Sequence, residues 1–112
     1  MRRGDVFNAR LNPTEGSEQA GTRPVVIVSR DAINRSSSVV VIVPLTKASN
    51  KRRLFPNQFK IDAGEGGLTE DSIFLGGQIR AVSKSRILRQ RGRLSDHIMQ
   101  QIERALRITL DL

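Results

Sequence analysis

The chain has 112 residues, enough to bury one hydrophobic core, so we expect a single domain over residues 1–112. No apolar run approaches the roughly 20 residues of a membrane span, so we expect no membrane segment. No long apolar stretch follows Arg2 and Arg3, so we expect no secretory signal. We therefore expect the protein to lie in the cytoplasm. The sequence has no cysteine, which excludes disulfides, thiol nucleophiles and thiolate zinc sites, and its formal net charge of +8 favours a polyanionic partner.

The amino-terminal half of the sequence predicts three strands. Polar and apolar residues alternate over about 5–11, which is the two-residue period of a half-buried strand. The polar segment 12–22 contains Pro13 and two glycines and predicts a long, mobile loop. The β-branched segments 24–29 and 38–46 are too continuous to alternate, so we expect strands buried on both faces at the centre of a sheet. The polar residues between these two strands predict one helical turn at most.

The middle of the chain predicts shorter elements. Residues 47–56 are basic and irregular, and a short strand near 58–61 leads into a glycine-rich turn. Residues 72–82 predict one further strand. Its glycine pair, Gly76 and Gly77, indicates a bulge or the close approach of another backbone segment.

The carboxyl-terminal part predicts a last short strand at 89–94 and an amphipathic helix over about 96–110. Ser95 is a favourable N-cap for this helix. Residues at intervals of three and four form its buried face: Ile98, Ile102, Ala105, Leu106 and Thr109. The chain therefore predicts a mainly β fold with a C-terminal helix, in which five or six mostly antiparallel strands form a small barrel.

The positive charge is concentrated in two segments that contain no acidic residue. The first holds Lys47, Lys51, Arg52 and Arg53, and the second holds Arg80, Lys84, Arg86, Arg89, Arg91 and Arg93. Two such clusters favour a nucleic acid as the partner, with an acidic protein as the second possibility.

The candidate chemistry is one that needs no metal, thiol or histidine. The acidic residues are scattered without ligand spacing, the glycines fit no nucleotide-binding motif, and the one histidine, His97, is expected to lie exposed at the start of the helix. RNA supplies its own nucleophile, the 2′-hydroxyl, and arginine suits the stabilisation of a phosphorane. Arg23 stands at the end of the loop, next to Pro24 where a strand is expected to begin, and Thr46 stands at the end of the apolar strand 38–46. Both reach one rim if those strands are neighbours.

Several motifs carry a family resemblance. The run RGDVFNARLNPTEGSEQAGTRPVVIVSRDAINR, with the later VIVPLT and SIFLGGQIRAV, resembles the MazF (PemK-like) toxins, the messenger-RNA interferases of type II toxin–antitoxin systems. The resemblance implies an SH3-like barrel of the CcdB/MazF type and a homodimer. It also implies metal-independent, sequence-specific cleavage of single-stranded RNA that leaves 2′,3′-cyclic phosphate and 5′-hydroxyl ends. An acidic MazE-like antitoxin is the implied inhibitor.

The resemblance also assigns site residues. Arg23 in TRPVV and Thr46 in VPLT match the catalytic positions; Ser17, Glu18 and Gln19 match the substrate loop, and Gln78 and Arg80 match the GQIR strand. Lys51 and Arg52 are expected to add charge for RNA, and Phe55 is the best candidate for base stacking, although a place in the core is equally consistent. Gln78 could equally bond backbone groups at the glycine pair. Gly77 departs from the plasmid-encoded branch, which has an aspartate there.

Two other functions stay open at this stage. The first is a toxin similar to CcdB, which poisons DNA gyrase on the same scaffold without cutting RNA. The second is a barrel that binds RNA but does not cut it. The combination of Arg23, Thr46 and the GSEQAGTRP loop favours the endoribonuclease over both.

Overall fold

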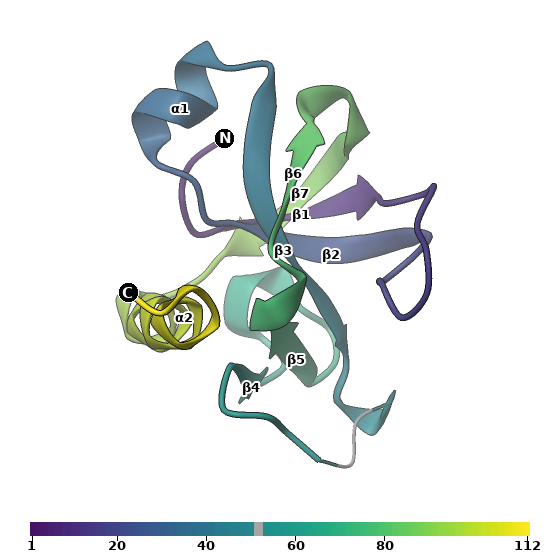
Figure 1. The fold of residues 1–112 in the computed structure, drawn as a ribbon, viewed down its shortest axis with the longest axis vertical. Coiled ribbons are helices and arrows are strands. Elements are labelled where there is room, and N and C mark those ends of the chain that lie inside the picture. Colours follow the sequence, from purple (N-terminus) through teal and green to yellow (C-terminus); the bar gives the residue numbers. More distant parts are fainter. Residues whose placement is uncertain (51–52) are drawn as a thin grey trace.

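The computed structural model describes residues 1–50 and 53–112 and is drawn in Figure 1. Its strands are β1 (Asp5–Arg10), β2 (Thr22–Ile27), β3 (Val39–Lys47), β4 (Gln58–Ile61), β5 (Ser72–Leu75), β6 (Arg80–Ser83) and β7 (Ile87–Arg93). Its α-helices are α1 (Asp31–Ser36) and α2 (Asp96–Leu110).

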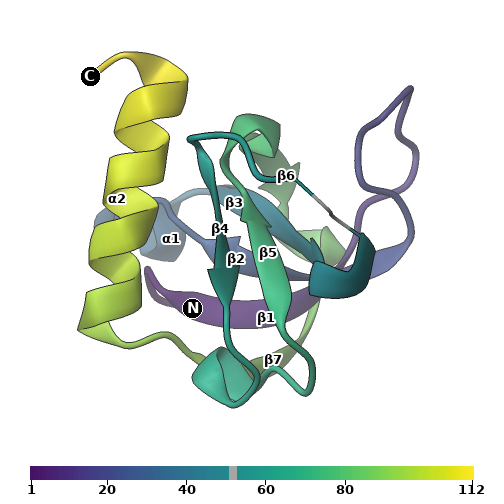
Figure 2. The same ribbon diagram turned by 90° about the horizontal axis from the view of Figure 1, so that it is seen from below.

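The sheet is antiparallel and turns on itself at β3. Its strand order is β4-β5-β3-β2-β1-β7, and β6 adds to β3 outside this path. One edge of β3 therefore has two partners: Val39–Ile42 pair with β6, and Leu45–Lys47 pair with β5. The two halves of the sheet diverge from this shared strand, as Figures 1 and 2 show. The expected mainly β, barrel-like fold with a C-terminal helix is confirmed, and the described residues form seven strands instead of five or six.

The additional strand arises at the glycine pair. The expected single strand over 72–82 is wrong, because a 3₁₀ turn at Gly76–Gln78 divides it into β5 and β6. Gly76 packs against the carbonyl oxygen of Asn57 so closely that any Cβ would overlap that oxygen. The expected close backbone approach is thus confirmed. This turn moves the chain from one half of β3 to the other.

Two apolar layers lie on opposite faces of the central strands. One layer joins Val6, Val26, Val43 and Leu45 to α2, and the other joins Phe7, Ala9, Val25, Ile27 and Ile42 to Val82. β2 and the middle of β3 are buried on both faces, as expected. The strand expected at 5–11 is confirmed as β1, but its expected half-buried character is wrong, because Val6 and Phe7 enter the core from opposite faces. β1 is also paired along both of its edges, with β2 on one side and β7 on the other.

Helix α2 has the predicted bounds. The Ser95 hydroxyl accepts a hydrogen bond from the Ile98 N–H at 3.4 Å, and Ile98, Ile102 and Ala105 are buried against the sheet. Full burial of an aliphatic side chain contributes about 1.5–3 kcal/mol, so this face can hold the helix in place. His97 is exposed at the helix start, as expected. Within residues 1–50 and 53–112, no helix has the length and apolar character to cross a membrane.

Helix α1 is longer than the single turn that the sequence predicts. Its Asn34 side chain is buried and donates a hydrogen bond to the Ser29 carbonyl at 2.9 Å, which ties the helix to the end of β2. The Asp31 carboxylate accepts the Arg3 N–H at 2.7 Å, and this bond lowers the pKa of Asp31. The contact with Arg3, which is 28 positions away, and the burial of Asn34 explain why local propensity underestimates the helix.

Candidate active site

A pocket opens where β2 and β3 separate. The two strands pair as far as Val25 and Pro44, and continuing this register by two residues would set Arg23 opposite Thr46. Pro24 and Pro44 have no N–H for the ladder, which weakens pairing at this end. Beyond this point Arg23 pairs with β1, while Thr46 pairs with β5. The divergence leaves a hollow between two residues that are far apart in the sequence.

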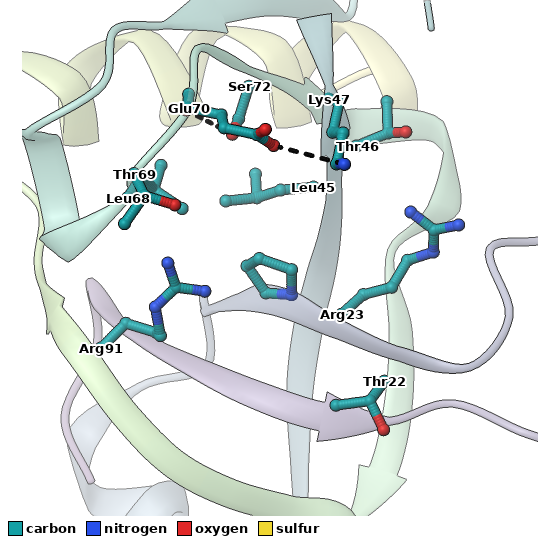
Figure 3. Close-up of a pocket in the computed structure, with 11 residues that line it drawn as sticks. Thr22, Arg23, Leu45, Thr46, Lys47, Leu68, Thr69, Glu70, Ser72 and Arg91 are labelled. Carbon is teal, nitrogen blue, oxygen red and sulfur yellow. Dashed lines mark hydrogen bonds and ion pairs between the residues drawn. The ribbon is translucent and has the colours of Figure 1, made fainter.

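We call this hollow the β2–β3 pocket; Figure 3 shows its lining. Its volume is about 200 Å³, and its walls comprise Thr22, Arg23, Pro24, Leu45, Thr46, Lys47, Leu68, Thr69, Glu70, Ser72 and Arg91. Leu45 and Leu68 belong to the buried core, so the pocket has an apolar base below charged and hydroxyl-bearing walls. The expectation that Arg23 and Thr46 reach one rim is therefore confirmed in geometry.

The Arg23 side chain is held at its stem and free at its tip. Its Nε donates a hydrogen bond to the Ala20 carbonyl at 2.9 Å. The structure records no hydrogen bond or ion pair from its terminal nitrogens to any described residue, and Figure 3 shows the guanidinium pointing toward the side of the pocket that carries Thr46. A guanidinium anchored through Nε still offers the planar pair of terminal donors that matches two oxygens of a phosphate.

The Thr46 hydroxyl is oriented by a neighbour that sequence reasoning missed. Thr46 is only 5% exposed, and its Oγ1 accepts a hydrogen bond from the Asn50 side-chain Nδ2 at 3.2 Å. Because the oxygen is the acceptor in this bond, the hydroxyl proton is left to donate elsewhere. Asn50 lies in the short 3₁₀ helix Ala48–Asn50 directly after β3. Only the turn after the strand brings its amide back to Thr46, and no sequence motif signals this contact.

The charges around the pocket fall into two groups. Lys47 and Glu70 pair with each other, with Nζ and Oε2 3.6 Å apart. Arg23 and Arg91 form no ion pair with any carboxylate of the described residues. Arg91 comes from β7 and was expected only as part of a basic cluster. The pocket thus presents two arginines whose charge is not already neutralised by an acidic side chain of this part of the chain.

A second hollow, the loop pocket, collects the other predicted site residues. Its volume is about 170 Å³, and it is lined by Leu11, Glu18, Gln19, Pro44, Gly77, Gln78, Ile79 and Arg80. Gln78 accepts the Gln19 N–H at 2.8 Å and donates to the Ser17 carbonyl at 3.4 Å. Arg80 Nη1 lies 4.0 Å from Glu18 Oε2. The backbone groups that Gln78 bonds therefore belong to the β1–β2 loop, and they are not those of the glycine pair.

The remaining predicted residues lie after β3. Phe55 is 57% exposed, so the alternative of a core position is wrong and the ring is open to solvent. Lys51 and Arg52 lie outside the described residues. Among residues 1–50 and 53–112, no three side chains of His, Cys, Asp or Glu gather as a possible metal site.

Comparisons with known proteins agree with this geometry. A family model described as the PemK-like, MazF-like toxin of type II toxin–antitoxin systems matches residues 2–110. The Endoribonuclease MazF of Staphylococcus saprophyticus is 40% identical over 112 residues, a match that covers all of this chain and 92% of that protein. This match favours the endoribonuclease over the CcdB-like alternative.

Solved structures give the same result. A mycobacterial endoribonuclease in complex with its cognate antitoxin is 28% identical, with a TM-score of 0.81 over all of this chain and 96% of that one. MazF from Deinococcus radiodurans has the same fold, with a TM-score of 0.84 at 20% identity over all of this chain and 97% of that one. With the family model spanning nearly the full length, the chain belongs to the PemK-like, MazF-like toxin family.

Proposed function

We propose that residues 1–112 form one endoribonuclease toxin domain that cuts single-stranded messenger RNA at specific RNA sequences. The reaction takes place in the β2–β3 pocket. The 2′-hydroxyl of the RNA attacks the adjacent phosphorus and the bond to the 5′-oxygen breaks. The proton lost by the 2′-hydroxyl is balanced by one gained by the leaving 5′-oxygen, so the products are a 2′,3′-cyclic phosphate and a 5′-hydroxyl. No water or metal enters this step. The observation that carries the proposal is that Arg23 and Thr46 line the same pocket.

Arg23 stabilises the charge that develops on the phosphorane. Its anchored Nε fixes the side chain, and its terminal N–H groups contact two non-bridging oxygens. A preorganised donor of this kind acts mainly on the transition state, because the negative charge of the phosphate oxygens is greatest there. The charge of an arginine also persists throughout the physiological pH range.

Thr46 donates its hydroxyl proton to a phosphate oxygen. The Asn50 amide supports this orientation by occupying the oxygen of the same hydroxyl. Because Thr46 is nearly buried, its hydroxyl gains more from such a bond than an exposed hydroxyl would. Thr46 thereby assists Arg23 in holding the scissile phosphate.

The flanking RNA binds through charge and through the β1–β2 loop. Ser17, Glu18 and Gln19 lie in a loop that projects from the sheet in Figure 2, and Gln78 and Arg80 support it from β6 and the preceding turn. The exposed Phe55 ring is available for stacking on a base. Lys51 and Arg52 add positive charge after β3. RNA affinity should accordingly fall as the salt concentration rises.

Partners and location follow from the same proposal. The mycobacterial relative was solved with its cognate antitoxin, and the net charge of +8 on this chain suits an acidic MazE-like inhibitor. We propose that the toxin acts in the cytoplasm as a homodimer.

The function is tested by mapping 5′ ends on a long, defined RNA incubated with purified protein in excess EDTA. We expect discrete cuts whose 5′ ends accept phosphate directly from polynucleotide kinase, since they carry a hydroxyl. The matched control is the same RNA with a single 2′-deoxy nucleotide on the 5′ side of the mapped bond, which should resist cleavage. Inhibition by EDTA with recovery on added magnesium would refute the mechanism, as would products with 5′-phosphates.

A further inference from the structure

Arg91 stands out on β7 because it occupies a β-bulge. Along the β1–β7 ladder Val6 pairs with Gly92 and Phe7 pairs with Gln90, so β7 advances by two residues where β1 advances by one. Arg91 is the extra residue. A bulge redirects the side chain of the inserted residue, and bulges are common beside active sites. Here the redirected side chain lines the same pocket as Arg23 and Thr46.

A glycine-rich turn fixes this bulge. The 3₁₀ turn Glu65–Gly67 packs directly on it: a Cβ on Gly67 would overlap the Arg91 carbonyl, and one on Gly92 would lie 2.8 Å from the Gly67 nitrogen. Gly66 and Gly67 both have positive φ, at 58° and 70°. Only glycine permits both this backbone conformation and this approach. The close packing of this turn on the bulge therefore positions the backbone of Arg91.

The Arg91 side chain is held but not neutralised. Its Nη1 donates to Asn8 Oδ1 at 3.2 Å and its Nη2 donates to the Gly67 carbonyl at 3.3 Å. Both acceptors are uncharged, and a guanidinium has five N–H groups, so these contacts leave three donors. The side chain is half-buried, and Figure 3 shows it on the opposite side of the pocket from Arg23. A fixed arginine with unused donors and no acidic partner among the described residues is suited to an anion.

We propose that Arg91 is a second phosphate-binding residue, which holds the RNA phosphate next to the scissile one while Arg23 holds the scissile phosphate. This inference rests on the proposed function and adds a contact that sets how the strand lies across the pocket. Two arginines on opposite walls bind two points of the backbone and so fix the orientation of the nucleotide between them. Arg91 is thus a substrate-positioning residue, whereas Arg23 acts on the reacting phosphate.

The test combines a protein variant that lacks the charge of Arg91 with RNAs in which one phosphate at a time is uncharged. Arg91→Gln keeps most of the stem and removes the charge, and Arg35→Ala removes one exposed arginine on α1 as the matched control. Single-turnover cleavage is measured on a short RNA carrying one methylphosphonate at each position in turn. In the parent we expect about a tenfold loss when the phosphate adjacent to the scissile one is neutralised, as for one charged hydrogen-bonded contact. Arg91→Gln should lose about tenfold on unmodified RNA and nothing further at that single position. Arg35→Ala should match the parent.

Each result then decides the inference. A merely structural role for Arg91 would lower cleavage equally on every RNA and leave the methylphosphonate profile unchanged, which would overturn the proposal. The proposal would also be overturned if the parent protein cut at an unchanged rate with a neutral phosphate on either side of the cut, whatever the variant does. It would equally be overturned if Arg91→Gln weakened the binding of an acidic peptide and left RNA cleavage unchanged. Arg91→Met, which also removes the charge and keeps an unbranched stem, replaces the glutamine variant in the same scan if the latter does not fold. Failure of the parent to cut RNA would count against the proposed function instead.

Discussion

The loop pocket and the β2–β3 pocket contain similar side chains in opposite bonding states. The loop pocket holds Arg80 near Glu18, and it holds Gln78 with both ends of its amide bonded to the loop. The β2–β3 pocket holds Arg23 and Arg91, neither of which has a carboxylate partner among the described residues. Arginine in the first pocket thus already has an acidic partner, whereas arginine in the second is available to an anionic ligand.

This difference separates two kinds of contribution to one reaction. A hydrogen bond that is already made in the free protein stabilises the loop in one conformation, and its net value is about 1 kcal/mol. A donor held in place without a partner retains its interaction for the substrate, where charge develops during the reaction. Substitutions in the β2–β3 pocket should therefore affect the rate of the chemical step, and substitutions in the loop pocket should mainly affect loop order.

The largest effect is expected for Arg23→Ala. Removing one preorganised charged donor should lower single-turnover cleavage by about a hundredfold or more. Arg23→Lys should recover little, since an ammonium cannot make the two-point contact of a guanidinium. Because the terminal nitrogens of Arg23 form no recorded hydrogen bond or ion pair with a described residue, the melting temperature should stay near that of the parent. A folded Arg23→Ala protein that cuts at nearly the parental rate would show that the two pockets do not differ as described.

A smaller effect is expected for the Thr46 and Asn50 pair. Thr46→Val removes the hydroxyl at nearly constant volume and should slow cleavage by about tenfold, as one hydrogen bond to a charged group would. Asn50→Ala should cost about threefold by releasing the hydroxyl from its orientation. Since both changes act on one donor, the double variant should be no slower than Thr46→Val alone. Additive losses in single-turnover assays would mean that Asn50 contributes independently of Thr46.

The sequence was sufficient for elements whose signals are local. Helix α2 has both a capping serine and a regular apolar period, and its predicted bounds agree with the structure. The two continuous β-branched segments became β2 and β3 because residues that are apolar on both sides require burial on both sides. Arg23 and Thr46 could be brought together in advance because Arg23 lies at the start of β2 and Thr46 near the end of β3, and the two strands are antiparallel neighbours.

Other features depend on contacts between distant segments. The division of 72–82 into two strands follows from β3 changing partners. The glycine pair of this segment indicates the close backbone approach but not the change of partner. Arg91 enters the pocket because β7 slips by one residue against β1, and such a slip leaves no periodic signal in a short strand. The interaction of Gln78 with the β1–β2 loop likewise joins residues about 60 positions apart. Local patterns could not predict these parts of the site.

The smallest effect on cleavage is expected for Gln78, and it should come with a distinct change in the loop. Gln78→Ala removes the acceptor of the Gln19 N–H and the donor to the Ser17 carbonyl. Losing about 1 kcal/mol of local stability should raise hydrogen exchange at the Gln19 amide about fivefold, and it should lower kcat/KM by only about twofold. Gln78→Glu is the matched control, because a carboxylate still accepts the Gln19 N–H but cannot donate to Ser17. It should restore slow exchange at Gln19. If Gln78 instead contacted RNA and left the loop alone, Gln78→Ala would slow cleavage without changing amide exchange in the free protein, and the loop pocket would then belong with the β2–β3 pocket as a substrate site.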